Sequence, residues 1–374
     1  MPSFVFLLII ALYLLASCYI AAKVCRALKF KPLAWRIAVW VVVLLLDISF
    51  FLSRLVPGEW LFAGRVLYVV STTWLPVVLY GSMSLLVLDV LRLVLTKTRG
   101  VTPYHTPLMV KMAGWATLLV MLIGHFVAVS PQETRYTVFS NKLPAGQDYT
   151  LALVSDIHAG YAVTEGDVAK IVEIVNSAGA DMTLIAGDLV DGNLAPVWSE
   201  NTLARLADIR SPMGVFAIMG NHEYIDDADD AARYIRSLRG VTLLRDSCAD
   251  AGPFRVVGRD DISLARAGRA RMPIDGFARA DSLFTIVMDH QPGAVADAVA
   301  IGADLSLSGH THGGQIWPMN IITGMIYELD YGFACYGSTA VVVTSGFGTW
   351  GPRMRVGSVA EVVLIDVCGT ARQS

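Results

Sequence analysis

Long apolar stretches dominate the first third of the chain. Four of them, at residues 4–22, 37–52, 66–95 and 107–129, contain few charged side chains. Each is close to or above the roughly 20 residues that a helix needs to cross the hydrocarbon core of a bilayer. The pattern therefore predicts an all-α anchor of about four transmembrane helices over residues 1–130. Because the third stretch is long and contains Pro76, we expect it to be tilted or kinked.

Two features of these stretches allow more than one interpretation. The first stretch could be a cleaved signal peptide, but no Lys or Arg precedes Lys23, and such signals begin with a basic segment. We therefore interpret it as a retained helix. Asp47 lies inside the second stretch, where an ionisable group can mark a transport pathway. A bundle-facing or interfacial aspartate is the simpler hypothesis.

Basic residues concentrate in two of the three connections between these stretches. The second connection, residues 53–65, carries two arginines against one glutamate. The other two are clearly basic, the first through Lys23, Arg26, Lys29, Lys31 and Arg36, and the third through Lys97 and Arg99. The positive-inside rule then places connections one and three in the cytoplasm. With four spans, the N-terminus and everything after residue 129 would be extracytoplasmic, and one miscounted span would reverse this.

The hydrophobic pattern changes at residue 149. Short apolar runs, typical of buried strands, alternate from there with amphipathic segments, which predicts a layered α/β domain over residues 149–374. Thr164 and Asp167 form a capping-box pattern at the start of one expected helix. Residues 131–148 are expected to be a connector, with one possible strand at 136–139. The expected strands are 150–154, 182–186, 215–219, 283–288, 304–307, 340–344 and 359–367, and further helices are expected at 198–209, 228–238 and 293–300.

Composition agrees with a membrane part and a separate soluble part. Hydrophobic residues make up 55% of the chain, and its mean hydropathy is +0.55. Residues 1–130 carry 11 Lys or Arg against 3 acidic residues, whereas residues 131–374 carry 18 against 29. An acidic domain without a cluster of basic residues is a poor partner for nucleic acid. The five cysteines contain no CxxC pair, so neither a disulfide framework nor a zinc knuckle is indicated.

Five of the seven histidines fall in the soluble part, each near the end of an expected strand or in a glycine-rich turn. Because strand ends meet at one edge of a sheet, these side chains can converge with nearby Asp and Asn residues. A single Asp-x-His is more often hydrogen-bonded support, but the whole set favours a site for borderline or hard divalent ions. The candidates are Asp156, His158, Asp188, Asn221, His222, His290, His310 and His312.

The order and spacing of these elements resemble the calcineurin-like metallophosphoesterase superfamily. The motifs are Asp156-Ile157-His158, Gly187-Asp188, Gly220-Asn221-His222-Glu223, His290 and the run from Gly309 to Gln315, which reads GHTHGGQ. The resemblance covers about residues 150–367. The ending His-Gly-Gly-Gln is similar to a branch of membrane-attached phosphoesterases that includes bacterial enzymes acting on lipid-linked phosphates.

The resemblance implies a four-layer αββα sandwich that holds two divalent metal ions, Mn, Fe or Zn. One ion would be held by Asp156, His158, Asp188 and His312, and the other by Asp188, Asn221, His290 and His310. The implied chemistry is in-line attack on phosphorus by a metal-activated hydroxide. His222 occupies the family position of a catalytic histidine that contacts phosphate or protonates the leaving group.

Two further segments of the soluble part each allow two interpretations. The segment from Gly346 to Arg355 resembles a late loop of the family, which could bring Arg353 or Arg355 to a substrate phosphate; a solvated arginine is the alternative. The acidic run at residues 226–230 could add metal ligands, but a solvated helix start is the simpler interpretation.

The sequence leaves three hypotheses for function. The first is a membrane-anchored phosphodiesterase or pyrophosphatase acting on a lipid-linked or envelope substrate. The second is a tethered broad-specificity phosphomonoesterase or nucleotide phosphodiesterase. The third, from another class, is a membrane sensor or transport component that binds metal without turnover. The expected partners are the lipid bilayer and a phosphorylated substrate.

Overall fold

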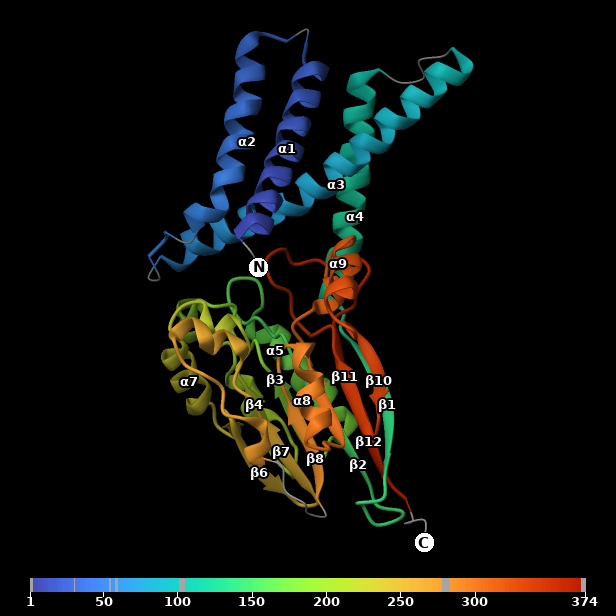
Figure 1. The fold of residues 1–374 in the computed structure, drawn as a ribbon. Coiled ribbons are helices and arrows are strands. Elements are labelled where there is room, and N and C mark those ends of the chain that lie inside the picture. Colours follow the sequence, from blue (N-terminus) through green and yellow to red (C-terminus); the bar gives the residue numbers. More distant parts are fainter. Residues whose placement is uncertain are drawn as a thin grey trace. The chain divides into compact units, whose positions relative to one another are not determined.

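Two compact units make up the chain (Figure 1). The computed structural model describes residues 3–29, 31–53, 55–57, 60–100, 105–277 and 283–370. The first unit is Met1–Phe126 with Gly351–Arg353, and the second is Val127–Trp350 with Met354–Ser374.

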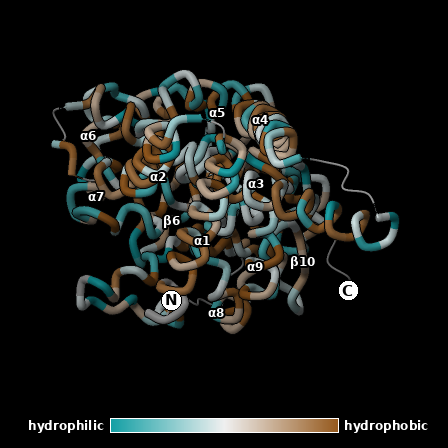
Figure 2. Tube along the Cα trace, turned by 90° about the horizontal axis from the view of Figure 1, so that it is seen from above, coloured by the Kyte–Doolittle hydropathy of each residue, from teal (hydrophilic) through white to brown (hydrophobic). Residues whose placement is uncertain are grey.

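Long helices form the first unit. They are α1 (Ser3–Ala27), α2 (Leu33–Ser53), α3 (Leu61–Arg99) and α4 (Thr106–Val129). Each contains one of the four predicted stretches, and all four are long and apolar enough to cross a membrane. Hydrophobic positions colour much of α2 and α4 brown in Figure 2. Pro76 lies inside α3, as predicted, and residues 54, 58 and 59 of the second connection lie outside the described residues.

Asp47 of α2 joins three of these helices. Its carboxylate accepts hydrogen bonds from Ser17 Oγ of α1 at 2.8 Å and from Trp74 Nε1 of α3 at 2.7 Å. A carboxylate in an apolar helix is stabilised when hydrogen bonds replace water. These contacts favour the bundle-facing interpretation of Asp47 over a transport pathway.

Two six-stranded sheets form the second unit. The first has the order β1-β12-β2-β3-β4-β5, and the second has the order β10-β11-β9-β8-β7-β6. Strands β2, β3, β4 and β5 run parallel in the first sheet, as do β7, β8, β9 and β11 in the second. The strand bounds are β1 (Gln132–Ser140), β2 (Asp148–Val154), β3 (Met182–Ala186), β4 (Val215–Ile218), β5 (Val241–Leu243), β6 (Ser247–Ala251), β7 (Phe254–Gly258), β8 (Phe284–Met288), β9 (Leu305–Ser308), β10 (Gly332–Tyr336), β11 (Thr339–Val343) and β12 (Glu361–Gly369).

The sheets pack face to face over an apolar core. That core includes Leu153 and Leu184 from the first sheet and Ile286 and Leu305 from the second, all fully buried. Helices cover the outer faces and make four layers in all, which confirms the predicted αββα sandwich. They are α5 (Glu165–Ala178), α6 (Leu194–Glu200) and α7 (Ala228–Ser237) over the first sheet and α8 (Val295–Ala300) over the second, while α9 (Met319–Ile326) follows β9.

The expected connector at residues 131–148 contains β1, which belongs to the sandwich and includes the possible strand expected at 136–139. All nine of its residues pair in parallel with β12. β1 lies at the sheet edge, and only Val138 and Ser140 are buried, so the apolar alternation of a buried strand is missing from its sequence. The domain therefore begins near residue 132 rather than 149.

The other expected elements agree with the structure to within a few residues. Thr164 and Asp167 form the predicted capping box of α5. The helix expected at 198–209 differs: α6 ends at Glu200, its C-cap Asn201 has a left-handed φ of 52°, and a short 3-10 helix follows. The short strands β5, β6, β7 and β10 were not predicted from the sequence.

The register of β1 gives a test of its place in the sheet. Val138→Asp would bury an unpaired carboxylate and should lower the free energy of unfolding by about 3 kcal/mol or more. Phe139 is the adjacent residue on the opposite face and is 71% exposed, so Phe139→Asp should have little effect. Thermal denaturation of the full chain in detergent would show the difference, and equal melting temperatures for the two variants would contradict this register.

Candidate metal centre

The candidate ligands all follow the ends of strands in the two sheets. Asp156, Asp188 and Asn221 come two or three residues after β2, β3 and β4, and His290 and His310 come two residues after β8 and β9. Because each sheet's parallel strands end at the same edge, these side chains gather there. The backbone ladder continues past the strands, since the His158 amide donates to the Asp188 carbonyl at 3.0 Å.

Most of these residues have an uncommon backbone conformation. Among the described residues, eight that are not glycine have positive φ, and five of them are candidate ligands. A left-handed φ costs a residue with a Cβ on the order of 1 kcal/mol or more, and such strain concentrates at functional sites. The five are Asp156 (54°), His158 (51°), Asp188 (49°), His310 (71°) and His312 (54°). The sharp turns aim these side chains back toward one centre.

Asp156, His158 and His312 form the first group, with ligand atoms within 4.8 Å of one another. The Nε2 atoms of the two histidines face each other at 3.1 Å. His312 Nε2 lies 3.4 Å from Asp156 Oδ1. All three side chains are buried.

Asp188, His290 and His310 form the second group. His290 Nδ1 donates to the Ala186 carbonyl at 2.7 Å, which turns Nε2 toward the site. That Nε2 lies 3.1 Å from Asp188 Oδ2 and 3.2 Å from Asn221 Oδ1. The amide oxygen of Asn221 is therefore part of the second group.

Asp188 connects the two groups. Its Oδ2 lies 3.1 Å from His290 Nε2 in the second group and 3.8 Å from His158 Nε2 in the first. Its Oδ1 accepts a hydrogen bond from the His222 amide at 2.8 Å. One carboxylate thus faces both histidine groups.

Asp191 was not predicted from the sequence. Its Oδ1 lies 3.1 Å from His222 Nδ1 and 3.4 Å from His158 Nδ1. One carboxylate thus orients both imidazoles, whose rings contact each other edge to face at a centroid distance of 4.5 Å. The sequence did offer a hint, because Asp191 lies shortly after the candidate ligand Asp188 in the same loop.

Glu223 belongs to the quoted motif but had no predicted role. Its buried carboxylate accepts backbone hydrogen bonds from Asp188 at 3.1 Å, Val190 at 2.9 Å and Gly220 at 2.7 Å. Burial and the charge of Asp188 raise the pKa of Glu223 to about 8, against the effect of the Val190 and Gly220 amides. Glu223 therefore fixes the loops after β3 and β4 to one another.

The pKa shifts of Asp188, His310 and His312 favour cation binding. Burial opposes the charged form of His290, but Asp188 outweighs it and raises the pKa of His290, which must give up a proton when a cation binds. Burial opposes charge on Asp188, but His290 and His222 hold the pKa of Asp188 well below its usual range. Burial and the charge of His290 lower the pKa of His310 to about 4, and burial together with His158 lowers that of His312. Neutral imidazoles and ionised carboxylates are the forms that bind metals, and no thiolate is present. The donor set fits divalent ions.

Two glycines let the ligand loops approach each other. A Cβ added to Gly309 would lie 2.2 Å from Asp156 Oδ2, and one added to Gly220 would lie 2.2 Å from Asp188 Oδ1. Real Cβ atoms do not approach that closely, so any other residue would displace a carboxylate.

Arg355 is buried, so neither open hypothesis, a substrate contact or a solvated arginine, describes it. Its side chain is fully buried, and Nη2 donates to the carbonyls of Ser345 at 2.8 Å, Gly346 at 3.0 Å and Gly348 at 2.6 Å. Burial lowers its pKa to about 10, so it remains a cation at neutral pH. It holds the loop after β11 in place beside His312. Arg353 groups with the helical unit and stays a prediction.

The acidic run at residues 226–230 forms a helix start, the simpler of its two interpretations. Asp227 caps α7 by accepting from the amides of Asp229 and Asp230, and Asp230 pairs with Arg233. Asp226 is exposed. None of these carboxylates occurs in the groups of possible metal ligands found among the described residues.

Comparison with known proteins agrees with this geometry. Residues 149–314 match the model of the calcineurin-like phosphoesterase family. An uncharacterized metallophosphoesterase of Aquifex aeolicus is 30% identical over 260 residues, which are 67% of this chain and 98% of that protein. The chain therefore belongs to the calcineurin-like phosphoesterase family, a class of phosphoester hydrolases, as the motifs predicted.

Two further relatives are longer than the matched region. An uncharacterized metallophosphoesterase of Campylobacter jejuni is 31% identical over 229 residues, 60% of each chain. A Bos taurus protein named transmembrane protein with metallophosphoesterase domain is 29% identical over 272 residues, 67% of this chain and 60% of that protein. The chain thus matches about 60% of the length of these two relatives.

The position of Asp188 between the two groups predicts that its substitution should reduce the amount of bound metal. Asp188→Asn keeps the shape but removes the charge between the two groups, so the purified full chain should lose at least half of its bound metal. Asp226→Asn removes the same charge from the exposed acidic run and should lose none. Elemental analysis after dialysis against Mn(II) measures both. Equal metal content in the two variants would contradict the role of Asp188.

Proposed function

We propose that the chain is a membrane-anchored, two-metal-dependent phosphoesterase that hydrolyses a phosphodiester or pyrophosphate of a lipid-linked or envelope substrate. The observation that carries this proposal is the Asp188 carboxylate between two groups of buried ligands, 3.1 Å from His290 and 3.8 Å from His158. Asp188 would touch both ions. The first ion would also be held by Asp156, His158 and His312, and the second by Asn221, His290 and His310.

When bound, such a pair of ions supplies a clamp for the phosphoryl oxygens and a nucleophile from water at neutral pH. The residues of this chain orient that pair. Asp191 and the Ala186 carbonyl fix the rings of His158 and His290, so that each presents Nε2 to the site.

His222 is the proposed catalytic group. Its side chain is 18% exposed, more than the candidate ligand His158, and it lies beside the first group. Although burial opposes the charged form, Asp188 and Asp191 raise the pKa of His222 to about 9. A protonated imidazole there can donate a hydrogen bond to a phosphate oxygen or a proton to the leaving group.

The apolar helices support a substrate that is confined to the membrane. All four are apolar enough to span a bilayer, and α4 ends at Val129, three residues before β1 begins at Gln132. So short a link keeps the start of β1 within about 11 Å of the end of α4. The basic first and third connections favour an extracytoplasmic hydrolase domain.

Hydrolysis of two chromogenic esters tests the proposed function. The full chain with Mn(II) should cleave a 4-nitrophenyl phosphodiester in preference to 4-nitrophenyl phosphate. His222→Ala should lower kcat by about 100-fold or more, because general acid catalysis contributes that much, while bound metal stays unchanged. Asp226→Asn serves as the matched control. A metal-loaded, folded chain that cleaves neither ester would favour the sensor hypothesis.

A further inference from the structure

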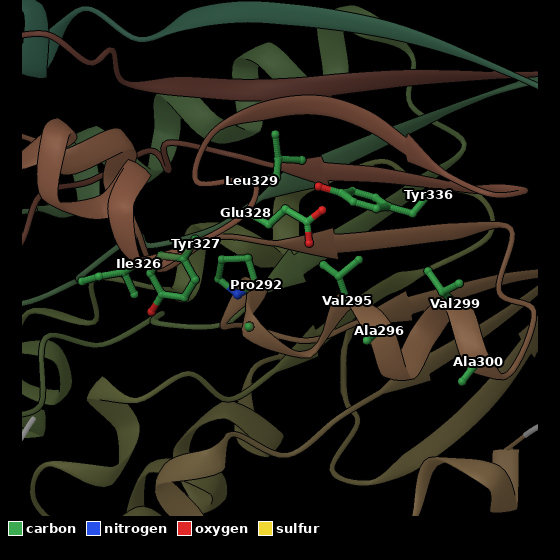
Figure 3. Close-up of a pocket in the computed structure, with 11 residues that line it drawn as sticks. Pro292, Val295, Ala296, Val299, Ala300, Ile326, Tyr327, Glu328, Leu329 and Tyr336 are labelled. Atoms are coloured by element: carbon green, nitrogen blue, oxygen red, sulfur yellow. The ribbon is translucent and has the colours of Figure 1, made fainter.

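An apolar pocket lies in the second unit, between α8 and the segment that follows α9 (Figure 3). Its volume is about 490 Å³, within the range of pockets that bind small molecules. One wall is α8, which presents Val295, Ala296, Val299 and Ala300, and the opposite wall is the segment from Ile326 to Leu329 together with Tyr336.

Two lining residues connect this pocket to candidate metal ligands, one through the chain and one through a ring contact. Pro292 lines it and follows His290 by two residues. Tyr327 lines it as well, and its ring contacts the ring of His310 edge to face at a centroid distance of 6.1 Å. A molecule held at the metal centre could therefore extend into the pocket past Tyr327.

The residues that line the pocket suit an uncharged hydrocarbon ligand. Apart from two tyrosines, whose rings offer apolar faces, Glu328 contributes the one ionisable side chain among the described lining residues. A carboxylate at this position repels a second phosphate. The aliphatic side chains of α8 and Leu329 gain free energy when a hydrocarbon displaces water from them.

Helix α9 continues the apolar surface outward from the pocket rim. None of its eight residues is buried. Ile321 is 52% exposed, Met325 81% and Ile326 59%, and Trp317 just before the helix is 42% exposed. Exposed apolar surface of this kind marks an interaction site. Four helices of this chain are long and apolar enough to cross a bilayer, so lipid is available to it under the proposed function.

We propose that the pocket between α8 and the α9–β10 segment binds the hydrocarbon chain of an amphiphilic phosphoester whose phosphate lies at the metal centre. Placing the phosphate at the metal centre rests on the proposed function, whereas the binding site for the hydrocarbon rests on the pocket alone. Lipid, rather than a second copy of the chain or a peptide, is the occupant because the pocket lining is mainly aliphatic, Tyr327 of that lining contacts His310, and α9 at its rim contains no charged residue.

Chain-length dependence tests this proposal. The Mn(II)-loaded full chain in lipid nanodiscs should bind hexylphosphonate about tenfold or more tightly than methylphosphonate by calorimetry, because each buried methylene contributes to affinity. It should show the same preference in kcat/KM between hexyl and methyl 4-nitrophenyl phosphodiesters. Ala296→Trp fills the pocket and should abolish the preference for the longer chain in both measurements. Asp297→Trp adds the same side chain at an exposed position of α8 that does not line the pocket, and should keep the preference.

The outcomes separate the pocket from the hydrolase. Equal affinity for the two phosphonates, or a preference that survives in Ala296→Trp, would overturn the pocket proposal even if both esters are cleaved. A preference in binding without cleavage of either ester would support the pocket and remove the proposed function. If Ala296→Trp changes only the sedimentation of the chain, the pocket is an interface between two copies and the proposal fails.

Discussion

The structure of the site depends on one buried carboxylate. Asp188 faces histidines of both ligand groups, and its Oδ1 also fixes the backbone of His222. Burying an ionised carboxylate is costly unless positive charge compensates it. The raised pKa values of His222 and His290 show this demand, since protons on these imidazoles supply the charge that cations would otherwise provide.

The rest of the fold keeps that carboxylate and its neighbours in place. Five candidate ligands have a left-handed backbone, and such strain persists only where the surrounding structure enforces it. Glu223 accepts hydrogen bonds from three backbone amides in the loops after β3 and β4. Arg355 donates hydrogen bonds to three carbonyls in the loop after β11. The two sheets supply the rigid strand ends from which these loops depart.

Apolar periodicity predicted the membrane-type helices and most of the buried strands, because burial on both faces leaves a clear pattern. It missed β7, although all five of its residues are buried, and it found only part of the edge strand β1 and none of the edge strand β6, whose exposed faces carry polar residues. The convergence of the candidate ligands was predictable from motif spacing, since strand ends meet at one edge of a sheet. The roles of Asp191, Glu223 and Arg355 were not, because they depend on which loops meet in space. No sequence motif marks the residues that line the pocket beside α8, so the pocket could be found only in the structure.

Anomalous X-ray scattering from Mn(II)-loaded crystals of the full chain tests the central claim most directly. The account predicts two peaks on either side of the Asp188 carboxylate, about 3.5 to 4 Å apart, as in other two-metal sites. One peak would lie beside His158 and His312, and the other beside His290 and His310. A single peak, or peaks without contact to Asp188, would contradict a centre in which this carboxylate joins two ions.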